Sequence, residues 1–122
     1  MTKLRVAVIG AGHLGKIHTR LLQTQSEVDL VAVADPSPSA QQQIIDEFGA
    51  KVVSDYRKLI DQIDAAVVAT PTRMHFGIAN ELLNAKIHTL IEKPLTDSVS
   101  DANELAKSAE LNNCVVQVGH VE

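Results

Sequence analysis

Residues 4–35 read LRVAVIGAGHLGKIHTRLLQTQSEVDLVAVAD, and this segment determines much of the fold. The apolar run at residues 4–9 is short and rich in β-branched residues, and it ends at Gly10, as in a buried strand that leads into a tight turn. Apolar residues then recur at helical spacing over residues 13–25, and a second short apolar run occupies residues 28–34. The segment therefore predicts a strand, a helix and a second strand.

The remainder of the chain continues this alternation. Further short apolar runs predict strands at residues 51–53, 65–69, 88–91 and 115–118. Helical spacing and capping residues predict helices between them, at residues 37–48, 55–60, 74–85 and 98–112. Such strict alternation predicts an α/β fold with a doubly wound parallel sheet of about six strands and helices on both faces. Ligands of such sheets bind at the carboxyl ends of the strands.

Composition and charge narrow the range of functions. The chain has 122 residues, 45% of them hydrophobic, which is typical of one globular domain. The net charge is −4 without a basic run, so we expect a small-molecule ligand and neither nucleic acid nor a membrane surface as partner. Because no apolar stretch approaches ~20 residues and no signal peptide is evident, a cytoplasmic protein is expected. The chain stops at Glu122, shortly after its last predicted strand, which we interpret as a truncation.

A glycine motif opens the first predicted helix. Residues 10–15, GAGHLG, match G-x-G-x-x-G between a predicted strand and a predicted helix, the context in which this motif binds a dinucleotide. Gly10 permits the sharp turn, Gly12 lets the backbone approach a pyrophosphate, and Gly15 lets the helix pack close to the sheet. The alternative is a glycine-rich turn that binds nothing. The expected cofactor contacts in this motif are Gly10, Gly12, His13, Leu14 and Gly15.

Asp35 extends the motif. It ends the second predicted strand, about 20 residues after Gly15, where a carboxylate accepts hydrogen bonds from the adenosine ribose hydroxyls. Alone, Asp35-Pro36 is equally compatible with a simple turn, but together with the glycine motif it predicts a dinucleotide-binding Rossmann domain. A carboxylate ~4 Å from a phosphate charge repels it by about 4 kcal/mol at an effective dielectric of ~20. No arginine follows to offset this repulsion, so NAD is expected rather than NADP.

Residues 92–94, Glu-Lys-Pro, directly follow the fifth predicted strand. The nicotinamide end of an extended dinucleotide would reach this edge of the sheet. There the Lys93 ammonium is a candidate catalytic group that stabilises developing alkoxide charge or helps to remove a hydroxyl proton. The alternative is a solvated turn at the end of a strand.

The histidines and the cysteine give weaker signals. The five histidines lack paired ligand spacing, so no metal is expected. His75 begins the helix after the fourth strand and either caps it or faces the substrate, while His120 lies near the carboxyl edge of the sheet; both are candidates to line the site. His18 and His88 are expected to be structural or exposed. Cys114, which has no partner for an internal disulfide, is expected to be a packing residue.

The chain resembles the N-terminal domain of the glucose-fructose oxidoreductase and inositol dehydrogenase family, often called Gfo/Idh/MocA. The resemblance covers essentially the whole chain and rests on residues 8–15, 34–35, 69–71 with His75, 92–94 and 118–120. It implies a dehydrogenase that exchanges a hydride between NAD(H) and a hydroxyl or carbonyl of a sugar, cyclitol or nucleotide sugar. Under this resemblance Lys93 is the active-site lysine and Glu92 contacts the nicotinamide ribose. Thr70 and Pro71 form the loop beside that ribose.

The resemblance also bears on the rest of the protein. It implies a second, mainly β-sheet domain after residue 122 that supplies most substrate contacts, so the present chain alone is expected to be inactive. The complete enzyme is expected to be a homo-oligomer. Residues 12–16 and 119–122 are similar to members that act on nucleotide sugars, which rank first among expected substrates. The alternatives are a nucleotide-sensing regulatory Rossmann module without catalysis and a structural relative that has lost its cofactor.

Overall fold

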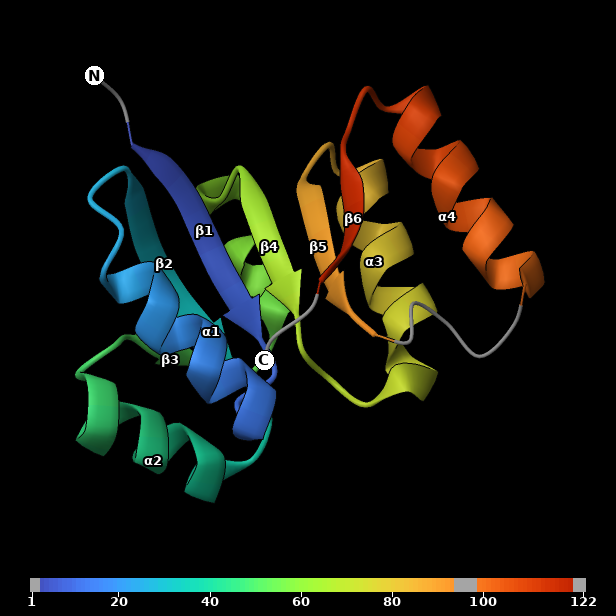
Figure 1. The fold of residues 1–122 in the computed structure, drawn as a ribbon. Coiled ribbons are helices and arrows are strands. Elements are labelled where there is room, and N and C mark those ends of the chain that lie inside the picture. The colour runs from blue at the N-terminus through green and yellow to red at the C-terminus, as the bar shows by residue number, and fades with distance from the viewer. Residues whose placement is uncertain (1–2, 94–98, 120–122) are drawn as a thin grey trace.

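The computed structural model describes residues 3–93 and 99–119. Six strands form one sheet with the order β3-β2-β1-β4-β5-β6, and all five neighbouring pairs are parallel. The order reverses between β1 and β4, as Figure 1 shows, which is the switch point at which such sheets bind ligands. The predicted fold class is confirmed. The strands are β1 (Leu4–Ile9), β2 (Val28–Ala34), β3 (Val52–Val53), β4 (Ala65–Val68), β5 (His88–Glu92) and β6 (Val116–Gly119).

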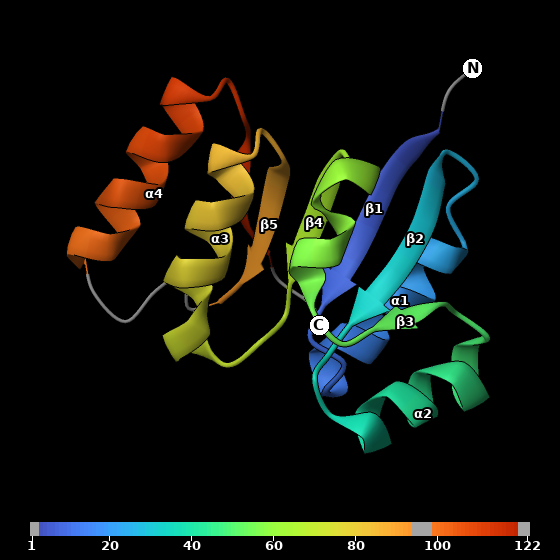
Figure 2. The same cartoon turned by 180° about the vertical axis from the view of Figure 1, so that it is seen from behind.

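Helices cover the two halves of the sheet from opposite sides. In Figures 1 and 2, α1 and α2 lie on one face, over β1 to β3, and α3 and α4 lie on the other, over β4 to β6. None of the helices in the described ranges is long and apolar enough to cross a membrane. The helices are α1 (His13–Gln23), α2 (Pro38–Phe48), α3 (His75–Asn84) and α4 (Val99–Leu111), with 3-10 helices η1 (Tyr56–Gln62) and η2 (Thr72–Met74).

The core lies on both faces of β1, because its side chains alternate between two clusters. Ala7 and Ile9 belong to the cluster beneath η1, α3 and α4, whereas Val6 and Val8 belong to the cluster beneath α1 and α2. All four side chains are buried. A strand buried on both faces reads as a continuous apolar run, which explains why the sequence of β1 shows no polar alternation.

All five predicted helices differ from the observed ones by one or two residues at an end, and one of them also differs in type. The segment predicted as a helix at residues 55–60 is the 3-10 helix η1, capped by the Asp55 side chain, which accepts a hydrogen bond from the Arg57 amide at 3.0 Å. A 3-10 helix rises ~2.0 Å per residue against ~1.5 Å in an α-helix, which suits a short connection that must cross β2 and β1. The helix predicted from residue 74 begins as α3 at His75, after the 3-10 turn η2.

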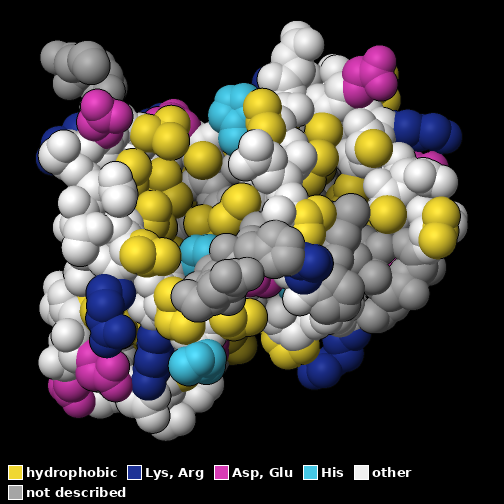
Figure 3. All heavy atoms as spheres, in the orientation of Figure 1, with side chains coloured by type: hydrophobic (Ala, Val, Ile, Leu, Met, Phe, Trp, Pro, Cys, Tyr) yellow, Lys and Arg dark blue, Asp and Glu magenta, His cyan; other side chains and the backbone are white. Residues whose placement is uncertain are grey.

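A second hollow lies on the face of the sheet that carries α1. Its volume is about 240 Å³, and its walls include the first residues of β1, β2, β4 and β5. Figure 3 shows hydrophobic side chains gathered on this face, beside α1. Since strands that start here end at the opposite edge, this hollow is separate from the carboxyl-edge pocket described below.

An exposed ion pair joins the start of β1 to the start of β4, and it should make the free energy of unfolding depend on pH in the acidic range. Asp64 accepts hydrogen bonds from the Arg5 guanidinium at 2.8 Å and from the Arg5 amide at 2.9 Å, which lowers the pKa of Asp64 to about 2. Both side chains are more than one third exposed, so Asp64→Asn should destabilise the fold by no more than about 1 kcal/mol.

Because folding lowers this pKa, the contribution is present above the ordinary carboxyl pKa of about 4 and is lost as the pH falls through about 2. Urea unfolding of wild type and Asp64→Asn at pH 7 and pH 3 measures it, and the difference should shrink at the lower pH. The nearby exposed Asp61→Asn is the control. If the free energies of unfolding of wild type and Asp64→Asn differed by the same amount at both pH values, the lowered pKa of Asp64 would be contradicted.

Candidate functional site

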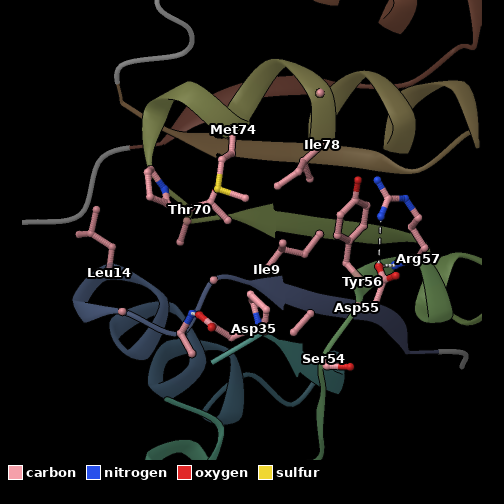
Figure 4. A pocket seen from close by; sticks show the side chains of 18 of the residues that line it. Ile9, Leu14, Asp35, Ser54, Asp55, Tyr56, Arg57, Thr70, Met74 and Ile78 are labelled. Carbon is pink, nitrogen blue, oxygen red and sulfur yellow. Dashed lines mark hydrogen bonds and ion pairs between the residues drawn. The ribbon is translucent and has the colours of Figure 1, made fainter. Parts of the chain in front are cut away.

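A pocket lies at the carboxyl edge of the sheet, at the switch point between β1 and β4. Its volume is about 1090 Å³, and its walls come from the glycine-rich loop, the end of β2, the segment after β3, the loop after β4 and the start of α3. Figure 4 shows Leu14 and Tyr56 at opposite ends of the pocket, with Asp35 and Thr70 on opposite sides between them. Segments far apart in the sequence therefore meet around one space that a ligand can fill.

Two of the motif glycines are required by the packing of the chain itself. Gly10 has a φ of +104°, and a Cβ there would lie 2.8 Å from the backbone of Ala69. A Cβ on Gly15 would lie 1.8 Å from the carbonyl oxygen of Gly10, closer than any side chain can approach. Gly15 therefore lets α1 approach the loop at the end of β1. The nearest contact with the sheet is the Val8 side chain, 3.8 Å from the position that a Cβ on Gly15 would take.

Gly12 differs from these two, because no atom of residues 3–93 and 99–119 requires a glycine there. Its φ is −78°, which any residue adopts, and a Cβ there would meet nothing within 4 Å. Gly12 is the N-cap of α1 and has no side chain that could accept a hydrogen bond from the first amides of the helix. Those amides therefore face the pocket without a side-chain partner from the N-cap. Such amides, with about half a unit of positive dipole charge, favour an anion. We call the space that a Cβ on Gly12 would fill, next to these amides, the cradle. A pyrophosphate needs such a space, so these residues fit that group.

Asp35 organises the loop as well as facing the pocket. Its Oδ2 accepts a hydrogen bond from the Ala11 amide at 2.8 Å, and its Oδ1 accepts one from the Ser37 amide at 2.9 Å. Because a carboxylate has about four acceptor sites, capacity remains for hydroxyl donors from the pocket. The side chain therefore joins the glycine-rich loop to the end of β2, a role that the sequence did not reveal.

A hydrogen-bonded cluster at the other end of the pocket escaped the sequence analysis. The Tyr56 hydroxyl donates to Glu81 Oε1 at 2.5 Å, and Arg57 Nε donates to Glu81 Oε2 at 3.0 Å. Burial, together with the hydrogen bond to Glu81, raises the pKa of Tyr56 to about 12, so the phenol stays neutral. No motif marks these residues, since Glu81 lies on α3 and meets the 3-10 helix only in the folded chain.

The loop after β4 contains one polar atom without a partner. Thr70 and Pro71 line the pocket, and Thr70 Oγ1 is buried without a hydrogen-bond partner among the described residues. His75 is 1% exposed, and its Nε2 lies 2.8 Å from the Thr70 carbonyl oxygen. His75 begins α3, as predicted, but it is not among the described residues that line the pocket; its ring instead supports the loop.

Glu92 and Lys93 leave the sheet beside this loop. Val68 pairs with Ile91, so the residues that follow them emerge from neighbouring strands at one edge. The Glu92 carboxylate is 5% exposed and hydrogen-bonds to His18 Nε2, whereas Lys93 is exposed. The walls of the pocket, as far as the chain is described, include neither Glu92 nor Lys93.

The remaining predicted residues are placed as follows. His13 is exposed, begins α1 and lines the pocket. His120 and Pro94 lie outside the described residues. Cys114 packs against the core cluster, and burial raises the pKa of its thiol. Within residues 3–93 and 99–119, no three His, Cys, Asp or Glu side chains gather as a metal site would require.

Comparison with known proteins identifies the family to which the chain belongs. The model of an oxidoreductase family with an NAD-binding Rossmann fold, Gfo/Idh/MocA, matches residues 4–120. The chain is 31% identical over 122 residues to the UDP-N-acetylglucosamine 3-dehydrogenase of Acidithiobacillus ferrooxidans, covering 100% of this chain and 38% of that protein. It is 37% identical over 122 residues to inositol 2-dehydrogenase 4 of Saccharopolyspora erythraea, covering 96% and 36%.

A solved structure agrees with these matches. The crystal structure of GenD2 from gentamicin A biosynthesis, in complex with NAD, superposes with a TM-score of 0.91 at 33% identity. The match covers 98% of this chain and 35% of that one. The chain thus spans less than two fifths of the length of each of these relatives.

Proposed function

Because the chain belongs to the Gfo/Idh/MocA oxidoreductase family and forms its NAD-binding Rossmann domain, we propose that it holds NAD for hydride transfer to or from a sugar-like substrate. The observation that carries this proposal is the open cradle at Gly12, beside the Asp35 carboxylate. When bound, NAD accepts or donates a hydride at its nicotinamide ring. The chain's own residues bind and orient that cofactor.

The described pocket divides into parts with different chemistry. Gly12 and the first amides of α1 hold the pyrophosphate, and Asp35 accepts hydrogen bonds from the adenosine ribose. The end lined by Tyr56 and Ile78 takes the adenine, because it lies beyond Asp35 and combines aromatic and aliphatic surface. Thr70 Oγ1, which lacks a partner in the described chain, is available to a ribose hydroxyl or phosphate oxygen.

Lys93 is the proposed catalytic residue. It follows β5 at the edge where the loop of Thr70 leaves β4, and its exposure leaves the ammonium accessible to a substrate. A positive charge there stabilises an alkoxide oxygen or moves a hydroxyl proton. The resemblance of residues 92–94 to the family motif supports this role, and Glu92 is proposed to contact the nicotinamide ribose.

The substrate is proposed to be a nucleotide sugar or a cyclitol. This follows from the relatives, one a dehydrogenase of UDP-N-acetylglucosamine and the other of inositol. Since the chain spans at most 38% of these relatives, we propose that a following domain supplies most substrate contacts and that this chain alone turns over little. A regulatory module without catalysis is the weaker candidate, because both of these curated relatives are dehydrogenases.

The activity is tested on the full-length protein. It should reduce NAD, followed by NADH absorbance, with at least one substrate from a panel of UDP-N-acetylglucosamine, myo-inositol and free hexoses. Binding of NADH without turnover on any member of the panel, together with a nucleotide-dependent change in assembly, would instead support the regulatory module.

Asp35 should determine the preference between NADH and NADPH. Asp35→Ala should weaken NADH binding and shift the affinity ratio towards NADPH by at least about tenfold, because the carboxylate no longer repels a 2′-phosphate. Fluorescence titration with both nucleotides measures the ratio. Asp35→Asn removes the charge but keeps an acceptor for the Ala11 amide, so it separates charge from loop order. Asp55→Asn, at another wall of the pocket, is the control. An unchanged ratio in both Asp35 variants would refute the ribose assignment.

A further inference from the structure

A buried histidine on α1 holds the acid of the Glu-Lys-Pro segment. His18 is 8% exposed and Glu92 is 5% exposed, and His18 Nε2 is hydrogen-bonded to Glu92 Oε1. The two residues are 74 positions apart in the chain. Because a buried carboxylate without a partner is costly, this contact determines where the Glu92 side chain points.

The contact joins the two halves of the sheet. His18 belongs to α1, which follows β1, whereas Glu92 ends β5, with β4 lying between these strands. The same helix begins at the phosphate cradle of Gly12. The neighbouring Thr19 is 0% exposed and donates a hydrogen bond from Oγ1 to the Gly15 carbonyl one turn earlier in α1, at 2.8 Å. One helix therefore contacts both the cradle and the Glu92 carboxylate.

We propose that His18 is a positioning residue that orients Glu92 towards the nicotinamide half of the bound dinucleotide. This inference rests on the proposed function and extends it to a residue that touches neither cofactor nor substrate. The ring of His18 engages Oε1, and Oε2 is the proposed acceptor for a hydroxyl of the nicotinamide ribose. Lys93 follows Glu92 directly, so the same contact restrains the start of the segment that carries the lysine.

The test compares two ligands that differ only in the nicotinamide half. NADH contains the nicotinamide riboside, whereas ADP ends at the pyrophosphate and lacks both this ribose and the ring. In the full-length protein, His18→Leu should weaken NADH binding about tenfold and ADP binding no more than about twofold, measured by titration calorimetry. Glu92→Gln should produce the same split, and the two changes combined should be non-additive because they act through one contact.

Two variants separate positioning from general stability. His18→Gln retains an amide nitrogen that can donate to Glu92, so it should recover most of the NADH affinity that His18→Leu loses. His88→Leu alters a histidine at the other end of β5, whose Nδ1 accepts from the Val115 amide at 3.0 Å, and should change neither affinity. If His18→Leu does not fold, the split measured with Glu92→Gln and the near-wild-type NADH affinity expected of His18→Gln still decide the question.

The possible results are distinguishable. Selective loss of NADH with recovery in His18→Gln supports positioning of the nicotinamide half. Equal weakening of both ligands, or wild-type NADH affinity in His18→Leu, overturns this inference while leaving the proposed function intact. Failure of the wild-type protein to bind NADH would overturn the proposed function, and this inference with it.

Discussion

Replacing Gly12 with alanine should lower the affinity for NADH about 10- to 100-fold while the protein remains folded. A methyl group there meets no atom of the described residues, but it occupies the cradle above the first amides of α1. A hydrogen bond to a charged group contributes about 1.5–3 kcal/mol, and 1.4 kcal/mol corresponds to tenfold in affinity, so losing one such bond gives about this range. Fluorescence titration with NADH measures the affinity, and urea unfolding measures the stability.

Gly15→Ala is the matched variant, because it adds the same methyl group to the same motif. There the new Cβ would lie 1.8 Å from the Gly10 carbonyl oxygen, so the loop or the helix must move. We expect a loss of about 3 kcal/mol or more in the free energy of unfolding, against at most about 1 kcal/mol for Gly12→Ala. If both variants lost stability equally, or if Gly12→Ala bound NADH as wild type does, the cradle would not hold a phosphate.

Lys93→Ala should produce the largest change in rate. In the full-length enzyme, with a substrate identified from the panel above, kcat should fall about 100- to 10,000-fold, the usual contribution of a positioned proton-transfer group. The affinity for NADH should change little, since the described pocket does not include this side chain. Stopped-flow measurement of NADH formation, combined with an NADH titration, separates the two effects.

The control for this variant is Lys58→Ala, another exposed lysine, which lies on η1. It should retain wild-type kcat and NADH affinity. Near-normal turnover by Lys93→Ala would exclude Lys93 as the catalytic residue, and a parallel loss of NADH binding would show that the lysine acts on the cofactor instead.

Local patterns were sufficient to predict the fold. Residues 4–35 contain β1, α1 and β2 almost within the predicted bounds, because both strands are apolar enough to be buried and are followed by a glycine or an acid. The predicted helix was wrong in type where the path of the chain between strands determines the local structure. Residues 55–60 satisfy a short helical pattern, but the need to cross two strands favours the 3-10 helix η1.

The site was predictable only where its residues share a motif. Residues 10–14 and Asp35 line one pocket, since their spacing along the chain reflects one β-α-β unit, whereas Gly15 is not among the residues that line it. His18 contacts Glu92 and Tyr56 contacts Glu81, and each contact joins segments far apart in sequence. No local sequence pattern predicts such contacts. His18 was expected to be structural or exposed, and its burial agrees with a structural role. Its partner, Glu92, is brought to it only by the folding of the chain.

The central claim is that this pocket binds NAD and distinguishes it from NADP, and a parallel titration with NADH and NADPH tests it most directly. Nicotinamide fluorescence and the melting temperature should both show saturable binding, with NADH at least about tenfold tighter because Asp35 lies at the end of β2. Saturation by neither nucleotide, or equal affinity for both, would contradict the account.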